Sequence, residues 1–266
     1  MLAHERSGPT GRTPILLVHA GIADRRMWDP VWPTLTADRD VVRVDLRGYG
    51  ESTERPEGPW SPRADVLATL AALGIERAHA VGCSFGAGVA VEVALERSEA
   101  VASFVLAAPG GALLTEKTDE LAAFFEAEGT AIESGDLDAA VEANLVAWVD
   151  GPHRGPDVVP AAVRDAVRTM QRRAFDLTIG WPDEVWEAED ELDPEAPERL
   201  DEIAVPTLVV SGGLDIDSIG LAADRLLTGV REVRGVVWDD VAHLPSMERP
   251  DDFAALVLDW VDRAEE

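Results

Sequence analysis

Residues 82–86, Gly-Cys-Ser-Phe-Gly, form a G-x-S-x-G pattern that can present a serine nucleophile. An apolar run at 78–81 precedes the pattern and an apolar helical pattern at 87–95 follows it, which predicts a tight turn between a strand and a helix. In such a turn the residues two before and two after Ser84 crowd together, so both must be glycine. The turn would hold the Ser84 hydroxyl above the sheet at a helix N-terminus, where oriented amides favour negative charge.

A serine hydroxyl is a weak nucleophile that needs an imidazole base, and a carboxylate normally orients that base. In a doubly wound sheet such groups gather at the carboxyl ends of the strands. His243 follows the last apolar run of the chain, and we expect it to be the base. Asp215 follows the apolar run 206–210 and a Gly-Gly turn, and we expect it to be the acid, with Asp217 as the alternative.

An acyl-transfer site also needs hydrogen-bond donors for the tetrahedral oxyanion. The backbone N–H of Phe85, directly after the nucleophile, is the first expected donor. The second should come from the loop after the first apolar strand, from Gly21 or alternatively from Ile22. Backbone donors require no particular side chain, so the pattern leaves these two residues open.

The remaining histidines and the single cysteine have less specific positions. We expect His19 to fix the loop that follows it by hydrogen bonds, and His79 to pack at the surface or against a helix. His4 lies in a terminus that we expect to be mobile, and His153 lies in a loop of the cap. Buried cysteine is usually a small inert apolar residue, and we expect the Cys83 side chain to point away from that of Ser84.

Apolar runs typical of strands alternate with helical patterns, which predicts a doubly wound, mostly parallel α/β sheet covered on both faces. The segment before residue 15 has room for one edge strand at most. The predicted strands are 15–19, 41–45, 78–82, 102–107, 206–211 and 233–238, and the clearest helices of the core are 63–73, 87–97 and 250–263.

Between residues 110 and 203 no strand pattern occurs, and the segment is too long for an ordinary loop. Apolar spacing of three and four predicts helices at 115–128, 137–149 and 161–175. We therefore expect a core made of 1–110 and 203–266 with a helical cap inserted at 111–202. The acidic run 182–202 is expected to be a solvated face or loop rather than a metal site.

The composition excludes several classes of function. The 266 residues carry 51 acidic and 23 basic side chains, a net charge of −28, so nucleic acid is an unexpected partner. One cysteine excludes an internal disulfide and makes a thiolate metal cluster implausible. The chain shows neither an apolar span nor the apolar core of a signal peptide, so we expect a cytoplasmic protein that does not enter a membrane. The oligomeric state is left open.

Five motifs, in this order, resemble those of the α/β-hydrolase superfamily, in its cofactor-free branch with a helical lid. They are His19-Ala20-Gly21, the segment 45–52 (Asp-Leu-Arg-Gly-Tyr-Gly-Glu-Ser), 82–86, Gly213-Leu214-Asp215, and His243 followed by Glu248 and Pro250. The resemblance covers nearly the whole chain. It implies that no metal or organic cofactor is needed, and that Asp45 and Arg47 hold turns together.

Two positions depart from the family pattern. Many relatives have His-Gly where this chain has His19-Ala20, which leaves the inward-pointing amide undecided. The residue before the nucleophile is often histidine and here is Cys83. Haloalkane dehalogenases and epoxide hydrolases of this fold use aspartate at the nucleophile position, so Ser84 argues against both activities.

We therefore expect a serine hydrolase that cleaves a small to medium, largely apolar carboxylic ester or lactone through an acyl-enzyme. The same triad could serve C–C bond hydrolysis, amide cleavage or perhydrolysis, and a non-catalytic small-ligand receptor is the alternative from another class. Apolar residues of the cap and of the oxyanion loop either line the substrate pocket or pack the cap onto the core. These residues are Ile22, Met27, Trp28, Trp148, Met170 and Phe175, with Trp181 and Trp186 as further cap aromatics.

Overall fold

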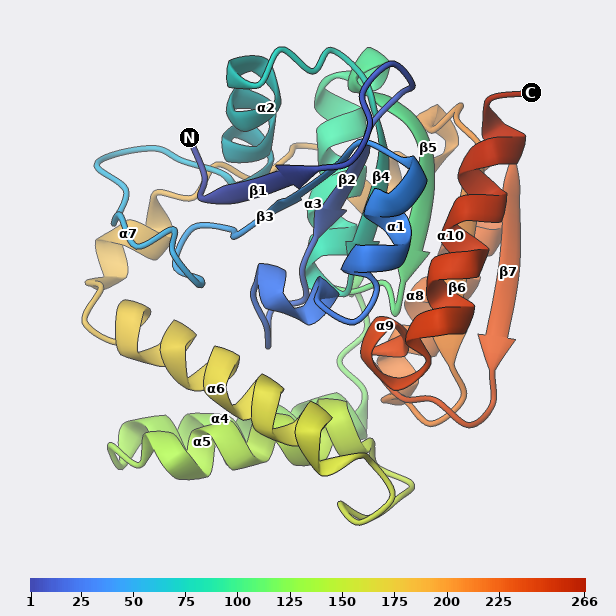
Figure 1. Cartoon of the computed structure of the whole chain (residues 1–266). Coiled ribbons are helices and arrows are strands. Elements are labelled where there is room, and N and C mark those ends of the chain that lie inside the picture. The colour runs from blue at the N-terminus through green and yellow to red at the C-terminus, as the bar shows by residue number, and fades with distance from the viewer.

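The computed structural model describes all 266 residues and contains one seven-stranded sheet (Figure 1). The strand order is β1-β3-β2-β4-β5-β6-β7, with β1 antiparallel to β3 and every other neighbouring pair parallel. The strands are β1 His4–Ser7, β2 Ile15–Val18, β3 Val41–Val44, β4 Ala78–Cys83, β5 Val101–Ala107, β6 Thr207–Gly212 and β7 Val233–Trp238.

The six predicted strands are confirmed to within one residue at each end, and so is the doubly wound, mostly parallel fold class. The expectation of a mobile terminus at His4 is wrong, because His4 pairs with Val44 in the edge strand β1. The Nδ1 atom of His4 also lies 3.0 Å from the Leu2 carbonyl oxygen. Pairing to an already formed sheet satisfies the backbone groups of this short segment.

Both faces of the sheet are buried, because successive side chains of each strand alternate between two apolar clusters. In β2, Ile15 and Leu17 belong to one cluster, and Leu16 and Val18 belong to the other. The first cluster packs under α1 (Trp32–Asp38), α9 (Pro245–Glu248) and α10 (Pro250–Ala264). The second packs under α2 (Pro62–Ala72), α3 (Phe85–Glu96) and most of α8 (Asp217–Gly229).

The helical insertion lies between β5 and β6, beyond the carboxyl ends of the parallel strands (Figure 1). Its helices are α4 Asp119–Glu133, α5 Leu137–Asn144, α6 Ala161–Thr178 and α7 Asp183–Glu187, and a π-helix, Leu145–Asp150, continues α5. The chain also contains five short 3₁₀ turns. They are Arg25–Trp28 after β2, Ser98–Ala100 before β5, Gly111–Leu113 after β5, and Ala196–Glu198 and Leu200–Glu202 before β6.

Two cap helices begin or end away from their predicted positions for local reasons. Helix α4 begins at Asp119 because the Thr118 side chain accepts a hydrogen bond from the N–H of Leu121 and so caps the helix. The predicted helix 137–149 changes from α to π geometry at Leu145. After α7, Ala196 and Leu200 pack into the same apolar cluster as α3, so the exact division of the chain into core and cap stays a prediction.

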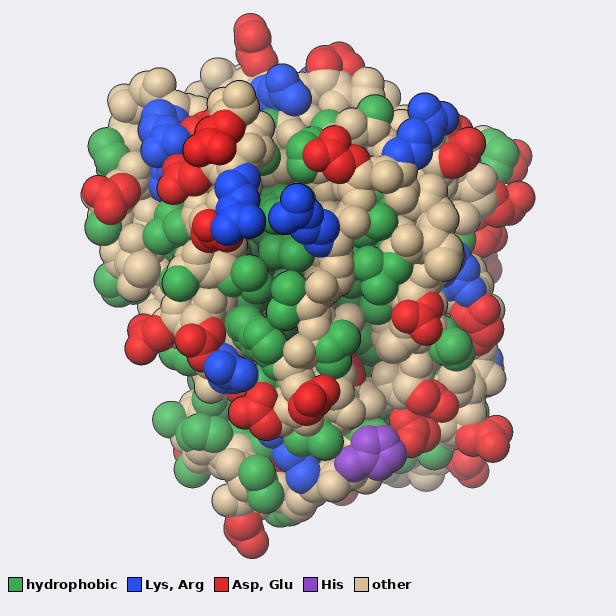
Figure 2. Space-filling view, turned by 90° about the vertical axis from the view of Figure 1, so that its right-hand side faces the viewer, with side chains coloured by type: hydrophobic (Ala, Val, Ile, Leu, Met, Phe, Trp, Pro, Cys, Tyr) green, Lys and Arg blue, Asp and Glu red, His purple; other side chains and the backbone are tan.

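The surface carries the acidic excess as scattered side chains, and Figure 2 shows this on the face that holds the edge strand β7. Apolar side chains gather near the centre of that face (Figure 2), and Val237 of β7 is 62% exposed. None of the helices has the length and apolar character needed to cross a membrane.

Candidate active site

Ser84 lies between β4 and α3 with φ 53° and ψ −117°, one of only two non-glycine residues with positive φ. A Cβ added at Gly82 would collide with the carbonyl oxygen of Gly86, and one added at Gly86 would collide with that of Val18. Both glycines are therefore sterically required for the turn. The side chain of Ser84 is part-exposed, at the N-terminus of a buried helix.

Gly110 packs against Ser84, and the sequence pattern did not predict this contact. A Cβ at this position would lie 3.0 Å from Oγ of Ser84, and its N–H donates to the Ser84 carbonyl oxygen at 3.2 Å. The strained residue Ala108, with φ 43°, leads the chain from β5 to this point. The only signal in the sequence is the Gly110-Gly111 pair, which follows the predicted strand 102–107 after Ala108 and Pro109.

His243 and Asp215 form a buried pair. The Nδ1 atom of His243 lies 2.8 Å from Oδ2 of Asp215, and the two residues are 1% and 7% exposed. The other carboxylate oxygen of Asp215 accepts the N–H of Ile216 at 2.8 Å. Asp217 makes no such bond to His243: it is the exposed first residue of α8, and its backbone N–H donates to Glu120 of the cap. A carboxylate on Nδ1 leaves Nε2 of His243 to exchange protons.

Cys83 joins the elbow to the loop of the candidate base. Its Sγ lies 3.6 Å from the carbonyl oxygen of His243, although the two residues are 160 positions apart. Burial raises the pKa of the Cys83 thiol, and the side chain is fully enclosed. The thiol therefore stays protonated and works as a packing group between the two loops.

His19 anchors the loop that follows β2. Its Nδ1 atom lies 2.8 Å from the Ala20 carbonyl oxygen, and its Nε2 accepts the N–H of Leu46 at 2.8 Å. These two bonds require a neutral ring with the proton on Nδ1. Burial lowers the pKa of His19, in agreement with that neutral form. His79, by contrast, is buried at the other end of the sheet, 2.8 Å from the hydroxyl of Ser103.

The backbone N–H groups of Phe85, Gly21 and Ile22 have no hydrogen-bond partner within the protein. In the same loop, the N–H of Ala20 is taken by Sδ of Met27 at 3.3 Å. A Cβ at Gly21 would lie 3.5 Å from Cβ of Phe85, so the loop after β2 meets the start of α3. The two segments that carry these free donors thus lie next to each other, as an oxyanion site requires.

The segment 45–52 stabilises turns, as its motif implied. The carboxylate of Asp45 accepts the N–H groups of Arg25 and Glu51, each at 2.8 Å. Arg47 forms an ion pair with Asp65 at 2.5 Å. In the same segment, burial raises the pKa of Tyr49 to about 12, and the negative charges of Glu128 and Glu189 add to the effect.

The apolar pocket candidates occupy different surroundings. The ring of Trp148 lies 4.5 Å from that of His243, and Sδ of Met170 lies 3.5 Å from the N–H of Asp24. Ile22 is buried in the loop after β2, and Phe175 is half-buried against the apolar cluster to which Ile22 belongs. Met27 and Trp28 are fully enclosed, and Trp28 stacks on Phe253 of α10. Trp181 packs on Trp186, which is 45% exposed.

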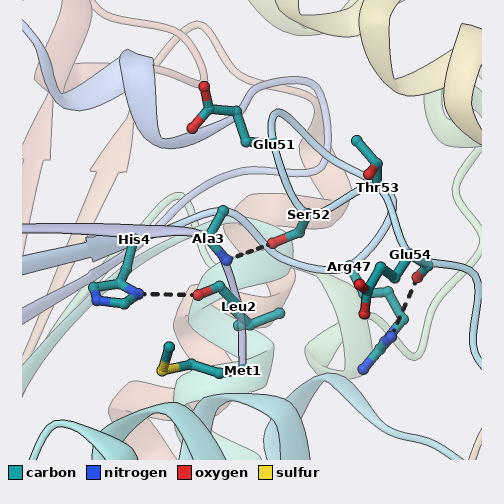
Figure 3. A pocket seen from close by; sticks show the side chains of 9 residues that line it. All are labelled: Met1, Leu2, Ala3, His4, Arg47, Glu51, Ser52, Thr53 and Glu54. Carbon is teal, nitrogen blue, oxygen red and sulfur yellow. Dashed lines mark hydrogen bonds between the residues drawn. The ribbon is translucent and has the colours of Figure 1, made fainter.

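A separate cavity of about 470 Å³ lies where the N-terminal segment meets the segment 51–54, and Figure 3 shows it. Three of its polar contacts are already made within the protein. Nδ1 of His4 faces the Leu2 carbonyl oxygen, Ser52 accepts the N–H of Ala3, and Arg47 donates to the Glu54 carbonyl oxygen (Figure 3). It contains none of the candidate catalytic residues.

Known proteins similar to this chain were found by sequence and by structure. The chain is 28% identical over 262 residues to a pimeloyl-[acyl-carrier protein] methyl ester esterase from Neisseria meningitidis serogroup C, covering 97% of this chain and 96% of the relative. It is 23% identical to 3-oxoadipate enol-lactonase 1 of Acinetobacter baylyi, covering 98% and 92%. The solved enol-lactonase from Burkholderia xenovorans LB400 superposes with a TM-score of 0.73 at 27% identity, covering 98% and 96%.

The profile described as the alpha/beta hydrolase family matches residues 15–256. That range runs from the first residue of β2 into the C-terminal helix, and it contains the elbow, the buried acid–histidine pair and the whole insertion. On this match, together with the fold and the elbow geometry, the chain belongs to the α/β-hydrolase family.

Proposed function

We propose that this chain is a serine hydrolase of small to medium, largely apolar carboxylic esters or lactones, with Ser84, His243 and Asp215 as its triad. The observation that carries the proposal is the buried hydrogen bond of 2.8 Å between His243 and Asp215. The backbone of His243 in turn contacts Cys83, the residue that precedes Ser84. The esterase and lactonase activities named for the relatives support the choice of substrate class.

In the proposed mechanism, Nε2 of His243 removes the proton of the Ser84 hydroxyl as Oγ attacks the carbonyl carbon. Asp215 keeps the imidazole in the required tautomer and stabilises its cation. The N–H of Phe85, with that of Gly21 or Ile22, binds the oxyanion. When the intermediate collapses, the imidazolium protonates the leaving alcohol, and His243 then activates the water that releases the acid.

The residues near the pair support an apolar substrate. Trp148 and Phe124, with ring centroids 5.1 Å apart, form an aromatic wall from His243 into the cap. Met170 of α6 contributes a flexible thioether next to the oxyanion loop. Such surfaces favour hydrocarbon over charged acyl groups.

The test is a panel of short-chain p-nitrophenyl esters and lactones, measured with the wild type and with Ser84→Ala. We expect turnover by the wild type and a loss of at least about 10³-fold in Ser84→Ala. A fluorophosphonate should label Ser84 in the wild type. Equal hydrolysis by both proteins would overturn the proposal, and tight ligand binding without turnover would favour a receptor. Product analysis with a vinylogous diketone, an amide, and peroxide plus acetate separates the other uses of the triad.

A further inference from the structure

The π-helix of the cap places an aromatic ring directly on the candidate base. Trp148 lies in the segment Leu145–Asp150, and its ring centroid is 4.5 Å from that of His243, with 45° between the planes. Phe124 of α4 supports the indole from behind, edge-on at 5.1 Å. Trp148 is 7% exposed, so the indole has little freedom to move away. Single turns of π-helix often occur at functional sites, because they change where side chains point.

The same segment contacts the loops of both the acid and the base. Gly151 ends the π-helix with φ 77°. A Cβ at this position would collide with the carbonyl oxygen of Leu214 and lie 3.2 Å from Cβ of Ala242. Leu214 directly precedes Asp215, and Ala242 directly precedes His243. The cap backbone is therefore seated against both loops, and only glycine permits this approach.

An ion pair holds this contact in place. Arg154, just after the π-helix, pairs with Glu248 at 2.5 Å, and both side chains are 8% exposed. Glu248 also accepts the N–H of Ala242 at 2.9 Å, and Arg154 donates to the carbonyl oxygens of Val149 and Asp240. Hydrogen bonds thus run from the end of the π-helix to the residue before His243.

We propose that Trp148 is a positioning residue for the triad, which rests on the proposed function of Ser84 and His243. With Asp215 on Nδ1 and the tilted indole packed against the ring, the imidazole keeps Nε2 available to the Ser84 hydroxyl. When His243 takes the Ser84 proton, the ring becomes a cation, and the indole face stabilises it. Docking of the cap then determines whether the triad is competent, beyond any role of the cap in substrate choice.

The test separates this role from that of a pocket wall. We compare Trp148→Leu, Trp148→Phe and Trp148→Met with the wild type, and Phe125→Leu is the matched control. Phe125 is a half-exposed aromatic of the cap that touches Phe124 and no triad residue. Two reactions are followed: hydrolysis of p-nitrophenyl acetate, and phosphonylation of Ser84 by a small alkyl fluorophosphonate, with fluoride as the leaving group. Both reagents are too small to depend on a filled acyl pocket.

We expect Trp148→Leu to lower kcat and the phosphonylation rate in parallel, by about 10- to 30-fold, with KM nearly unchanged. Trp148→Phe should recover most of both rates, because it keeps a ring on the imidazole, while Phe125→Leu behaves as the wild type. Trp148→Met fills more of the site than leucine and provides a second non-aromatic variant if Trp148→Leu does not fold. Wild-type phosphonylation in a folded non-aromatic variant, with only KM raised, would overturn the proposal. A wild type that neither hydrolyses esters nor is labelled at Ser84 would instead overturn the proposed function.

Discussion

Leu46 and His19 join the two loops that follow β3 and β2. The backbone N–H of Leu46 donates to Nε2 of His19 at 2.8 Å, and the other ring nitrogen lies 2.8 Å from the Ala20 carbonyl oxygen. The imidazole, fully enclosed, thus fixes the start of the loop whose Gly21 and Ile22 amides remain free. It contributes through geometry, and His243 carries the proposed proton transfer.

Replacing His19 with phenylalanine should damage both stability and activity. The ring is similar in size but leaves the Leu46 N–H unpaired in a buried place, which costs about 1–3 kcal/mol. We expect a lower melting temperature and a fall of about tenfold or more in kcat/KM for p-nitrophenyl acetate, because the oxyanion loop loses its anchor. His153→Phe, at an exposed position in the cap, is the control and should change neither quantity. A fully active, equally stable His19→Phe would contradict this role.

The two buried histidines should make the protein less stable in mild acid. Burial is the largest cause that lowers the pKa of both His19 and His79. As the pH falls below about 6.5, these residues take up protons in the unfolded chain but not in the native one. The stability that these two neutral histidines contribute is therefore fully present above that pH. It is lost as the pH falls from there toward their lowered native pKa values. Urea unfolding at a series of pH values measures the free energy of unfolding, and its dependence on pH should be shallower in His79→Gln.

Glu92 should have the opposite pH dependence. Burial raises its pKa from 4.5 to about 7, and it lines a cavity of about 290 Å³ with Glu189, Glu191 and Glu195. Because the native state favours the protonated carboxyl, this residue lowers stability as the pH rises from about 4.5 to about 7. Glu92→Gln should therefore raise the melting temperature at pH 8 and have little effect at pH 4.5. Glu133→Gln, at an exposed position of α4, should have no such effect; equal melting curves for Glu92→Gln and wild type at pH 8 would count against the raised pKa.

Asp215 and Asp217 provide a matched pair of substitutions. Asp215→Asn keeps the shape of the side chain but removes the charge that orients and stabilises His243, so kcat should fall by about 10³- to 10⁴-fold. Asp217→Asn should keep kcat within about twofold, because Asp217 is exposed and His243 pairs with Asp215 instead. Steady-state kinetics on one ester measure both. Equal losses would mean that the acid has been wrongly assigned.

Two glycines test the steric argument for the elbow. Gly82→Ala would place a Cβ against the Gly86 carbonyl oxygen, so we expect weaker folding and loss of activity. Gly129 lies inside α4, with open space around its Cβ position. Gly129→Ala should therefore raise stability by about 0.5–1 kcal/mol, through helix propensity alone. Chemical denaturation of both variants gives the comparison, and a stable, active Gly82→Ala would refute the requirement for glycine.

Most of the sheet could be predicted because its strands are buried on both faces and read as apolar runs. Local capping and helix irregularity were harder to see. The start of α4 depends on a hydrogen bond of the Thr118 side chain, and the change to π geometry at Leu145 leaves no clear mark in the apolar spacing. The edge strand at His4 forms only because β3 offers it a partner.

The sequence by itself determined the turn that presents Ser84, on which its proposed chemistry depends. A strand, a tight turn that demands glycine, and a helix are local features, and a few neighbouring residues suffice to specify them. Tertiary structure decided between the expected Asp215 and its alternative Asp217 as the partner of His243. It also brought Gly110 against Ser84 and Trp148 against the imidazole. Those contacts join residues far apart in the chain, so they depend on how loops and cap pack together, and packing is a property of the whole fold.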